Sequence, residues 1–383
     1  MNTSTGAAVA QNSKEITDSP ILGVWHRPNS SMRETNLKEL CRVLDEFSEA
    51  GVNLVFVESF YHGMALFKND MVEYHTRVRE FDYSPYPDYL SAFAAEADKR
   101  GINVYAWVQD FYVGFRDYER LILENPDWIL KNQDGSIRHM TEGHGFGGYI
   151  FLDPANSEVR DFLVRFYDDL LTKIPTIKGL NLDYIRYPIS VFDDNTDTGY
   201  TEVCMKEFCK KHSLTLNAKN PVRDLNKQIK ERGLLSSWTA HRASYITAFV
   251  EQVRTMVNSN HPGKKISTAV FSEIEQTYHL KKQSICVWLE RGYVDFVTPM
   301  VYYYEASQVF EAIQKLKAFC KGVKCYTGLY TTYHKQSIED LASHIDASES
   351  AGADGLVLFD AAKTFFEAEQ DYKSFLAERY KRK

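Results

Sequence analysis

Long apolar runs and blocks of basic charge are both missing from this 383-residue sequence. A helix that crosses a bilayer needs about 20 consecutive apolar residues, and no stretch reaches that length, so no membrane span is expected. The 45 Lys and Arg are spread along the chain against 52 Asp and Glu, which gives a formal net charge of −7. Because nucleic-acid-binding domains carry clustered basic residues, we expect no nucleic-acid partner.

A recognisable targeting sequence is also missing at the start of the chain. Residues 1–20 are rich in Ser, Thr, Asn and Ala, and no basic segment is followed there by an apolar one. A secretory signal peptide needs both features, so we interpret residues 1–20 as a disordered leader without a visible signal peptide. The residues themselves leave the compartment and the oligomeric state open.

Cysteine and histidine are too scattered to predict a metal site. No two cysteines have CxxC spacing, and no HxH pair follows an expected strand, which argues against a zinc site and a metal-dependent hydrolase. We expect mostly free thiols, with a Cys320–Cys325 disulfide as the alternative. The cysteines are Cys41, Cys204, Cys209, Cys286, Cys320 and Cys325. A glycine-rich dinucleotide-binding turn and a nucleophile elbow are missing too, so no cofactor is expected.

The sequence does contain a repeated alternation of apolar, strand-length runs with segments of helical periodicity. The expected strands lie at 21–25, 52–57, 102–108, within 179–188, and at 265–270, 294–300, 323–329 and 355–359. The expected helices lie at 34–50, 86–100, 154–172, 202–212, 236–258 and 366–380. This alternation predicts βαβ units and a parallel sheet, and eight strands close a barrel. We therefore predict one α/β domain over residues 21–383, a single (β/α)8 TIM barrel with extended βα loops at 111–150 and 190–233.

The stretch Gly179–Pro188, GLNLDYIRYP, is the centre of this pattern. It is short and bounded by Gly and Pro, and its apolar residues are those of a strand buried on both faces. An isolated buried charge is costly, so Asp183 is expected where the strand ends, at the edge of a cavity. The alternative is a structural Asp183 paired with Arg186, although the same arginine could hold a catalytic Asp183 ionised.

Carboxylates and aromatic rings follow many of the expected strands. In a (β/α)8 barrel the active site lies at these C-terminal strand ends. The polar residues there are His26, Glu58, Asp110, Asp183, Glu273 or Glu275, Glu305, His334 and Asp360, and the rings close by are Trp25, Trp107, Tyr187, Tyr302 and Tyr330. Carboxylates perform acid, base and nucleophile chemistry on glycosidic bonds, and aromatic rings cover sugar faces. The composition of these strand ends predicts a polysaccharide cleft.

Two alternatives bear on that prediction. Strand ends meet water in every such barrel, so polar residues there do not by themselves establish catalysis, and Trp25 and Trp107 are equally compatible with the barrel core. A phosphate-binding barrel uses glycine N–H groups after strands seven and eight. Here those ends read Tyr-Thr-Thr at 330–332 and Asp-Ala-Ala at 360–362, which favours a glycan over a phosphate.

Six stretches of the chain resemble a known family. They are GVWHRP, GINVYAWVQDF, NPDWILKNQDG, FLDPANSEVRDFL, GLNLDYIRYP and VDFVTPMVYYY. Together they resemble the family-10-like glycosyl hydrolases, bacterial (β/α)8 barrels often linked to the cell envelope, over most of residues 21–359. The resemblance implies an extracellular or envelope enzyme that hydrolyses a peptidoglycan-type or other amino-sugar polymer without a cofactor. The residues that match the family's motifs are Asn132, Asp134, Asp153, Pro154, Asp183, Arg186 and Tyr187.

The strand-end residues and the resemblance predict a glycosidase in which Asp183, held ionised by Arg186, is the nucleophile or base. A second strand-end carboxylate would be the acid. The candidates, in order, are Glu273, Glu305, Asp110 and Asp360, although the fifth strand end departs from the family's pattern. Substrate contacts are assigned to Trp25, His26, Glu58, Trp107, Asp110, Arg186, Tyr187, Tyr302, Tyr330 and Asp360. The alternatives are a non-catalytic carbohydrate-binding barrel and a sugar-modifying hydrolase such as a deacetylase.

Overall fold

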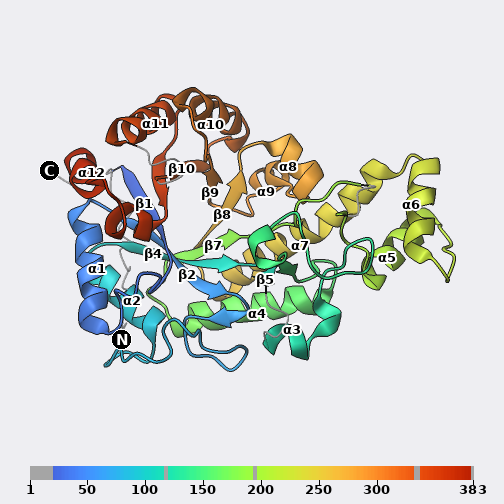
Figure 1. Cartoon of the computed structure of the whole chain (residues 1–383), viewed down its shortest axis with the longest axis horizontal. Helices are drawn as coiled ribbons and strands as arrows, with labels where there is room; N and C mark the ends of the chain where they lie inside the picture. Colours follow the sequence, from blue (N-terminus) through green and yellow to red (C-terminus); the bar gives the residue numbers. More distant parts are fainter. Residues whose placement is uncertain (1–19, 116–119, 193–195, 332–336, 381–383) are drawn as a thin grey trace, which may run out of the picture.

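The computed structural model describes residues 20–115, 120–192, 196–331 and 337–380. Within these residues, eight parallel strands close a barrel in the hydrogen-bonded order β1-β11-β10-β9-β8-β7-β4-β2, with β2 paired back to β1 (Figure 1). The strands are β1 Ile21–His26, β2 Leu54–Tyr61, β4 Asn103–Gln109, β7 Gly179–Asp183, β8 Lys265–Phe271, β9 Phe296–Met300, β10 Lys324–Tyr330 and β11 Gly355–Phe359. The predicted (β/α)8 TIM barrel is confirmed.

Helices connect the barrel strands and cover their outer faces. They are α1 Leu37–Glu49, α2 Tyr89–Lys99, α4 Ser157–Lys173, α7 Leu235–Asn260, α8 Ile274–Lys281, α9 Ile285–Glu290, α10 Ala306–Cys320, α11 Ile338–Ser350 and α12 Tyr372–Tyr380. The predicted start of the last helix, at 366, is wrong. A π-helix covers Ala362–Phe366, and α12 begins only after Asp371, whose Oδ1 accepts the Ser374 N–H at 3.0 Å.

The long βα loops carry structure of their own. The loop predicted at 111–150 contains the antiparallel pair β5 Tyr112–Gly114 and β6 Ile150–Phe151 together with the short helix α3 Arg120–Glu124. A further short strand, β3 Met64–Ala65, pairs antiparallel with β2. The 310 turns are Pro126–Trp128 and His144–Phe146.

The second predicted loop forms a projection that we call the side lobe. It consists of α5 Glu202–His212, as predicted, α6 Pro221–Glu231 and the N-terminal part of α7, and it extends to the right of the barrel in Figure 1. The side lobe has its own hydrophobic cluster, which includes Tyr200, Phe208, Leu225, Ile229 and Trp238. Two cores therefore stabilise the chain, one around the barrel and one in the side lobe.

Inward side chains fill the barrel in layers. Trp25 is 1% exposed, and its Nε1 donates to Asn181 Oδ1 at 3.1 Å in the barrel interior. A Cβ on Gly328 would lie 2.9 Å from the Trp25 ring and 2.8 Å from the Pro299 carbonyl oxygen, so only glycine fits beside this tryptophan. Trp25 therefore belongs to the barrel core, and its predicted contact with substrate is wrong.

All six cysteines lie within the described residues and are free thiols, so the Cys320–Cys325 disulfide is absent and the free-thiol prediction is confirmed. Among the described residues, no helix combines the length and the apolar character that a membrane crossing requires. Residues 1–19 of the expected leader, and His334 at the end of strand seven, lie outside the described residues.

Candidate active site

Asp183 is the last residue of β7, as predicted, and its side chain lies on the inner face of the barrel with Trp107 of β4. Trp107 Nε1 donates to Asp183 Oδ2 at 2.9 Å, and the Tyr184 N–H donates to Oδ1 at 2.7 Å. Tyr184 has φ 50°, so the chain turns away immediately after the strand and leaves the carboxyl group at its end. Burial raises the pKa of Asp183, although both donors and two nearby arginines act in the opposite direction.

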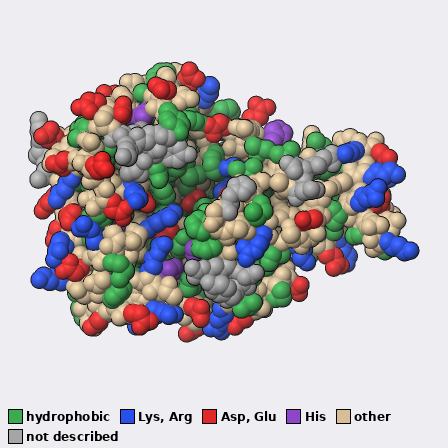
Figure 2. Space-filling model, in the orientation of Figure 1, with side chains coloured by type: hydrophobic (Ala, Val, Ile, Leu, Met, Phe, Trp, Pro, Cys, Tyr) green, Lys and Arg blue, Asp and Glu red, His purple; other side chains and the backbone are tan. Residues whose placement is uncertain are grey.

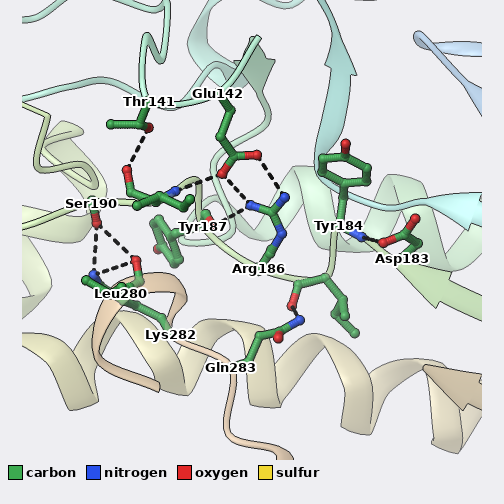
Figure 3. Close-up of polar contacts among 12 residues, drawn as sticks. Thr141, Glu142, Asp183, Tyr184, Arg186, Tyr187, Ser190, Leu280, Lys282 and Gln283 are labelled. Atoms are coloured by element: carbon green, nitrogen blue, oxygen red, sulfur yellow. Dashed lines mark hydrogen bonds and ion pairs between the residues drawn. The ribbon is translucent and has the colours of Figure 1, made fainter. Parts of the chain in front are cut away.

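Arg186 does not pair with Asp183, and that prediction is wrong. Its Nη1 and Nη2 atoms donate to the two carboxylate oxygens of Glu142 at 2.7 and 2.8 Å. Glu142 also accepts the Ile189 N–H at 2.9 Å, so it holds the loop after β7 at two points. Figure 3 shows the Arg186 guanidinium facing Glu142, whereas Asp183 bonds the Tyr184 backbone. Arg186 acts on Asp183 only through space.

Arg27, which follows β1, takes the place in the mouth that the sequence analysis gave to Arg186. Its Cζ lies 5.4 Å from the ring centroids of Trp107 and Phe359, so the guanidinium covers the inner rings. Its Nε lies 3.7 Å from Glu58 Oε1. The Asp183 and Asp360 charges both lie within electrostatic range of Arg27. Arg27 is therefore the cation shared by the carboxyl groups of the barrel mouth.

Glu58 lies fully buried within β2 rather than after it. It accepts from Arg77 Nη1 at 2.9 Å and from Gln109 Nε2 at 3.1 Å. Burial raises the pKa of Glu58, while the charges of Arg27 and Arg77 lower it. These contacts make Glu58 an anchor for two arginines, and its side chain is closed to solvent.

The opposite side of the mouth carries Asp360 and several rings. Asp360 follows β11, is half-buried, and accepts the Lys363 N–H on Oδ1 at 3.0 Å. In the barrel order, β11 lies four strands from β7, so Asp183 and Asp360 stand on opposite walls. Tyr302 packs 5.5 Å from the Tyr330 ring. Burial and then the Asp183 charge raise the pKa of Tyr302, and Asp360 adds to this, so both carboxyl groups are near its hydroxyl.

The surface is hollowed over the barrel, with hydrophobic side chains around acidic and basic ones (Figure 2). Lys281, at the end of α8, lies on the wall of the mouth with its Nζ 3.1 Å from the Phe271 ring centroid. Burial lowers the pKa of Lys281 to about 7, and the Arg186 charge acts in the same direction. Among the described residues, no group of three or more His, Cys, Asp or Glu is arranged to hold a metal ion.

Two predicted acids are more exposed than Asp183, although Glu273 lies within electrostatic range of Lys281. Glu273 and Glu305 are exposed and occupy the N-cap positions of α8 and α10. The Glu305 N–H donates to Gln308 Oε1 at 3.3 Å, which is one half of a capping box. Both side chains are open to solvent.

Three other predicted site residues point away from the mouth. His26 bonds Glu34 Oε1 at 3.0 Å and stacks on Phe93 behind β1. Asp110 accepts the Tyr167 hydroxyl of α4 at 2.6 Å behind β4, and Tyr187 is fully buried. Successive side chains of a strand face opposite sides of it, which accounts for the directions of His26 and Asp110.

Sequence reasoning missed Arg27, Gln109, Glu142 and Lys281. For Arg27 and Gln109 a signal was present, since Trp25 and Trp107 face inward and the residue two positions further along each strand faces the same way. Glu142 lies in a loop without periodicity, and no pattern in the sequence joins it to Arg186.

The chain is similar to a known family and to curated proteins. The model of the family described as "Glycosyl hydrolase-like 10" matches residues 20–348. The chain is 23% identical over 310 residues to "Glycosyl hydrolase DigH" of Escherichia coli K12, covering 74% of this chain and 66% of that protein. It is also 23% identical over 320 residues to an "S-layer-related protein" of Niallia circulans, covering 73% of this chain and 19% of that protein.

Two solved structures of glycosidases share this fold. A β-galactosidase from Bacillus circulans sp. alkalophilus has a TM-score of 0.66 at 12% identity over 94% of this chain and 56% of that chain. The catalytic domain of a β-amylase from Paenibacillus polymyxa has a TM-score of 0.61 at 11% identity over 96% of this chain and 100% of that chain. At these identities the likeness establishes the barrel fold alone.

Proposed function

Because the chain belongs to the glycosyl hydrolase-like 10 family, we propose that it is a glycoside hydrolase whose paired carboxyl groups are Asp183 and Asp360. The observation that carries the proposal is the setting of Asp183. It ends a central barrel strand, lies on the inner face, and is oriented by the Trp107 indole and the Tyr184 amide. Active sites of (β/α)8 barrels are built from such strand ends.

We assign the role of general acid to Asp183, which reverses the role expected from the sequence. Its two hydrogen-bond donors are neutral N–H groups, and burial raises its pKa. A carboxyl group that protonates a leaving oxygen near neutral pH needs a raised pKa.

Among the predicted acids, Glu273 and Glu305 are exposed, so we choose Asp360 as the partner of Asp183. Asp360 is half-buried, follows the strand that lies opposite β7 in the barrel order, and has Arg27 within electrostatic range. We assign Asp360 the role of nucleophile or base. Arg27 lies with its Nε 3.7 Å from Glu58 Oε1, and Glu58 also accepts from Arg77.

The substrate class follows from the relatives and from the rings of the mouth. We propose a polysaccharide or a cell-envelope glycan, including amino-sugar polymers. A glycosyl hydrolase and an S-layer-related protein among the relatives agree with this class, and the Tyr302 and Tyr330 rings offer flat faces to a sugar.

The decisive experiment compares four single variants on a panel of neutral and amino-sugar oligosaccharides. Asp183→Asn and Asp360→Asn are expected to lower kcat by about 10²- to 10⁴-fold, the usual contribution of a positioned acid or base. Glu273→Gln and Glu305→Gln remove strand-end carboxylates of the same kind and are expected to stay within about twofold of wild type.

Unchanged hydrolysis in Asp183→Asn contradicts the proposal. Glycan binding without hydrolysis in the wild-type protein supports a carbohydrate-binding barrel instead. A requirement for a divalent cation supports a different sugar-modifying hydrolase.

A further inference from the structure

The side lobe differs in charge from the rest of the protein. Residues 202–232 contain eight Lys or Arg and four Asp or Glu, whereas the whole chain has a net charge of −7. Figure 2 shows basic side chains gathered at the end of the lobe, away from the barrel. The family's barrel chemistry does not require a basic surface in this place.

The basic residues of α6 share one face of the helix. Arg223, Lys227 and Lys230 are separated by four and three residues, so they lie above one another, and all three are exposed. The opposite face buries Leu225 and Ile229 in the core of the side lobe. Over this spacing the helix rises about 10 Å, which sets a row of positive charges along its axis.

This row borders a hollow of about 920 Å³. We call it the α6 groove and define it by Gln133, Lys219, Arg223, Asn226, Lys227 and Lys230. With Asn217 and Asn220, four cations and four amide side chains line the same space. Lys227 also pairs with Glu231 Oε1 at 3.8 Å. Asp224, the acid of the lining, is already engaged, because its Oδ2 accepts the Asn217 N–H at 2.8 Å.

Two buried amide atoms of the α6 groove lack a partner. Asn226 is 6% exposed; one polar atom of its side-chain amide meets the Tyr200 hydroxyl at 2.8 Å, and the other has no hydrogen-bond partner. Gln133 Oε1 is likewise buried and unpartnered. An unsatisfied buried donor or acceptor costs free energy, and native proteins contain few of them. Two amide atoms left open beside a hollow fit a ligand that carries hydroxyl groups, because a hydroxyl can donate or accept.

We propose that the α6 groove is a second binding site, which takes one strand of an anionic, hydroxyl-bearing polymer. Its phosphate or carboxylate groups contact the row of Arg223, Lys227 and Lys230, and its hydroxyls bond the amides of Asn226 and Gln133. The site shares no lining residue with the barrel mouth, so it stands independently of the proposed hydrolysis.

The row of charges favours a polymer over a single small anion, because a repeating anion can meet several cations at once. Nucleic acid is disfavoured, since proteins that bind single strands stack the bases on aromatic rings. Among the described residues that line the α6 groove, none is aromatic. Hydroxyl-rich polymers need no such ring.

The test measures binding to the full chain by calorimetry in low and moderate salt. The probes are poly(glycerol phosphate), hyaluronate, a neutral chito-oligosaccharide and single-stranded DNA of matched charge. We expect one of the first two to bind at least tenfold more tightly than the DNA, and the neutral sugar to bind elsewhere or not at all. Phosphodiester and carboxylate sources are told apart by which of the two polymers binds.

Variants locate the site. Arg223→Gln/Lys227→Gln/Lys230→Gln should weaken polymer binding at least tenfold and flatten its salt dependence, because fewer counterions are released. Lys315→Gln/Lys321→Gln/Lys324→Gln removes the same charge from exposed positions on the barrel and should change affinity less than twofold. Asn226→Asp replaces the amide by a carboxylate, which repels an anionic polymer, and should weaken binding about threefold to tenfold.

Three results overturn the proposal. They are failure of both anionic polymers to bind, equal losses in the α6 and barrel triple variants, and equal affinity for DNA or for phosphatidylglycerol vesicles. None of these outcomes affects the Asp183 test, since the two sites are assayed with different ligands.

Discussion

The barrel mouth and the α6 groove both concentrate charge, but they arrange it in opposite ways. In the mouth each of two cations has an acidic partner: Arg186 bonds Glu142, and Arg27 lies beside Glu58. In each pair at least one of the two side chains is largely or fully buried. In the α6 groove exposed cations of one sign outnumber the acids. Matched, buried charges hold side chains in fixed positions, whereas exposed charges of one sign attract a partner through the solvent. The charges of the mouth therefore fix side chains in position, whereas the charges of the lobe attract a partner of opposite charge.

The largest expected effect comes from breaking a matched pair of the mouth. Arg186→Met leaves the Glu142 carboxylate buried without its cation and should lower the free energy of unfolding by about 3–5 kcal/mol. Lys227→Met removes an exposed cation from the lobe and should change it by less than about 0.5 kcal/mol. Urea unfolding of both variants measures the contrast, and similar losses would contradict it.

A second prediction concerns the stability of the protein as the pH falls. Burial, with Arg77 and Arg79, lowers the pKa of His75 from 6.5 to about 3, so the folded state keeps this ring neutral. The unfolded chain binds the proton below about pH 6.5, so the contribution of neutral His75 is present above that pH and is lost as the pH falls toward 3.

Between pH 7.5 and 5, wild type should therefore lose about 2 kcal/mol more stability than His75→Gln, on the scale of about 1.4 kcal/mol per pH unit below 6.5. Urea titrations at the two pH values give this difference, and other groups cancel because both proteins carry them. Parallel pH dependences in wild type and variant would refute it.

A finer test concerns the donor to Asp183. Trp107→Phe keeps an aromatic ring but removes the N–H that favours the ionised carboxylate. The pKa of Asp183 should rise further, so the alkaline limb of the kcat/KM profile should move upward by about one pH unit if Asp183 is the acid. A limb that moves downward, or stays in place, would exclude that role.

The smallest effect is expected in the lobe. The Arg223→Gln/Lys227→Gln/Lys230→Gln variant should hydrolyse a neutral oligosaccharide within about twofold of wild type and unfold within about 0.5 kcal/mol of it, because exposed side chains contribute little to stability. Kinetics on the neutral substrate and thermal unfolding provide both readings. A large loss of activity would mean that lobe and mouth act together.

Much of the architecture could be predicted because its signals are local. Apolar runs, glycine stops and helical spacing placed the eight strands and put Asp183 at the end of β7, where it lies. The direction of each strand-end side chain was harder to predict, since moving one residue along the strand reverses that direction. From the sequence we chose His26 instead of Arg27 and Asp110 instead of Gln109, one residue away in each case. The inward direction of Trp25 and Trp107 would have indicated Arg27 and Gln109.

Other parts of the site depend on contacts that no local pattern encodes. Glu142 and Arg186 are 44 residues apart, and they meet because the loop between β5 and β6 brings Glu142 to the chain after β7. Carboxylates that look alike in sequence also differ in exposure: Glu273 and Glu305 are exposed at the starts of helices, whereas Asp183 is enclosed. Such distinctions need the packed loops.

The loop after β7 is tied down from both sides. Glu142 holds Arg186 and the Ile189 N–H, Lys282 donates to Ser190 at 2.9 Å, and Gln283 donates to the Ile185 carbonyl at 3.3 Å (Figure 3). Three segments of the rim are thereby joined into one unit. Substitutions within that unit are therefore poorly suited to changing the glycan that the protein accepts. New specificity would arise more readily on the facing half of the rim, after β1, β9, β10 and β11.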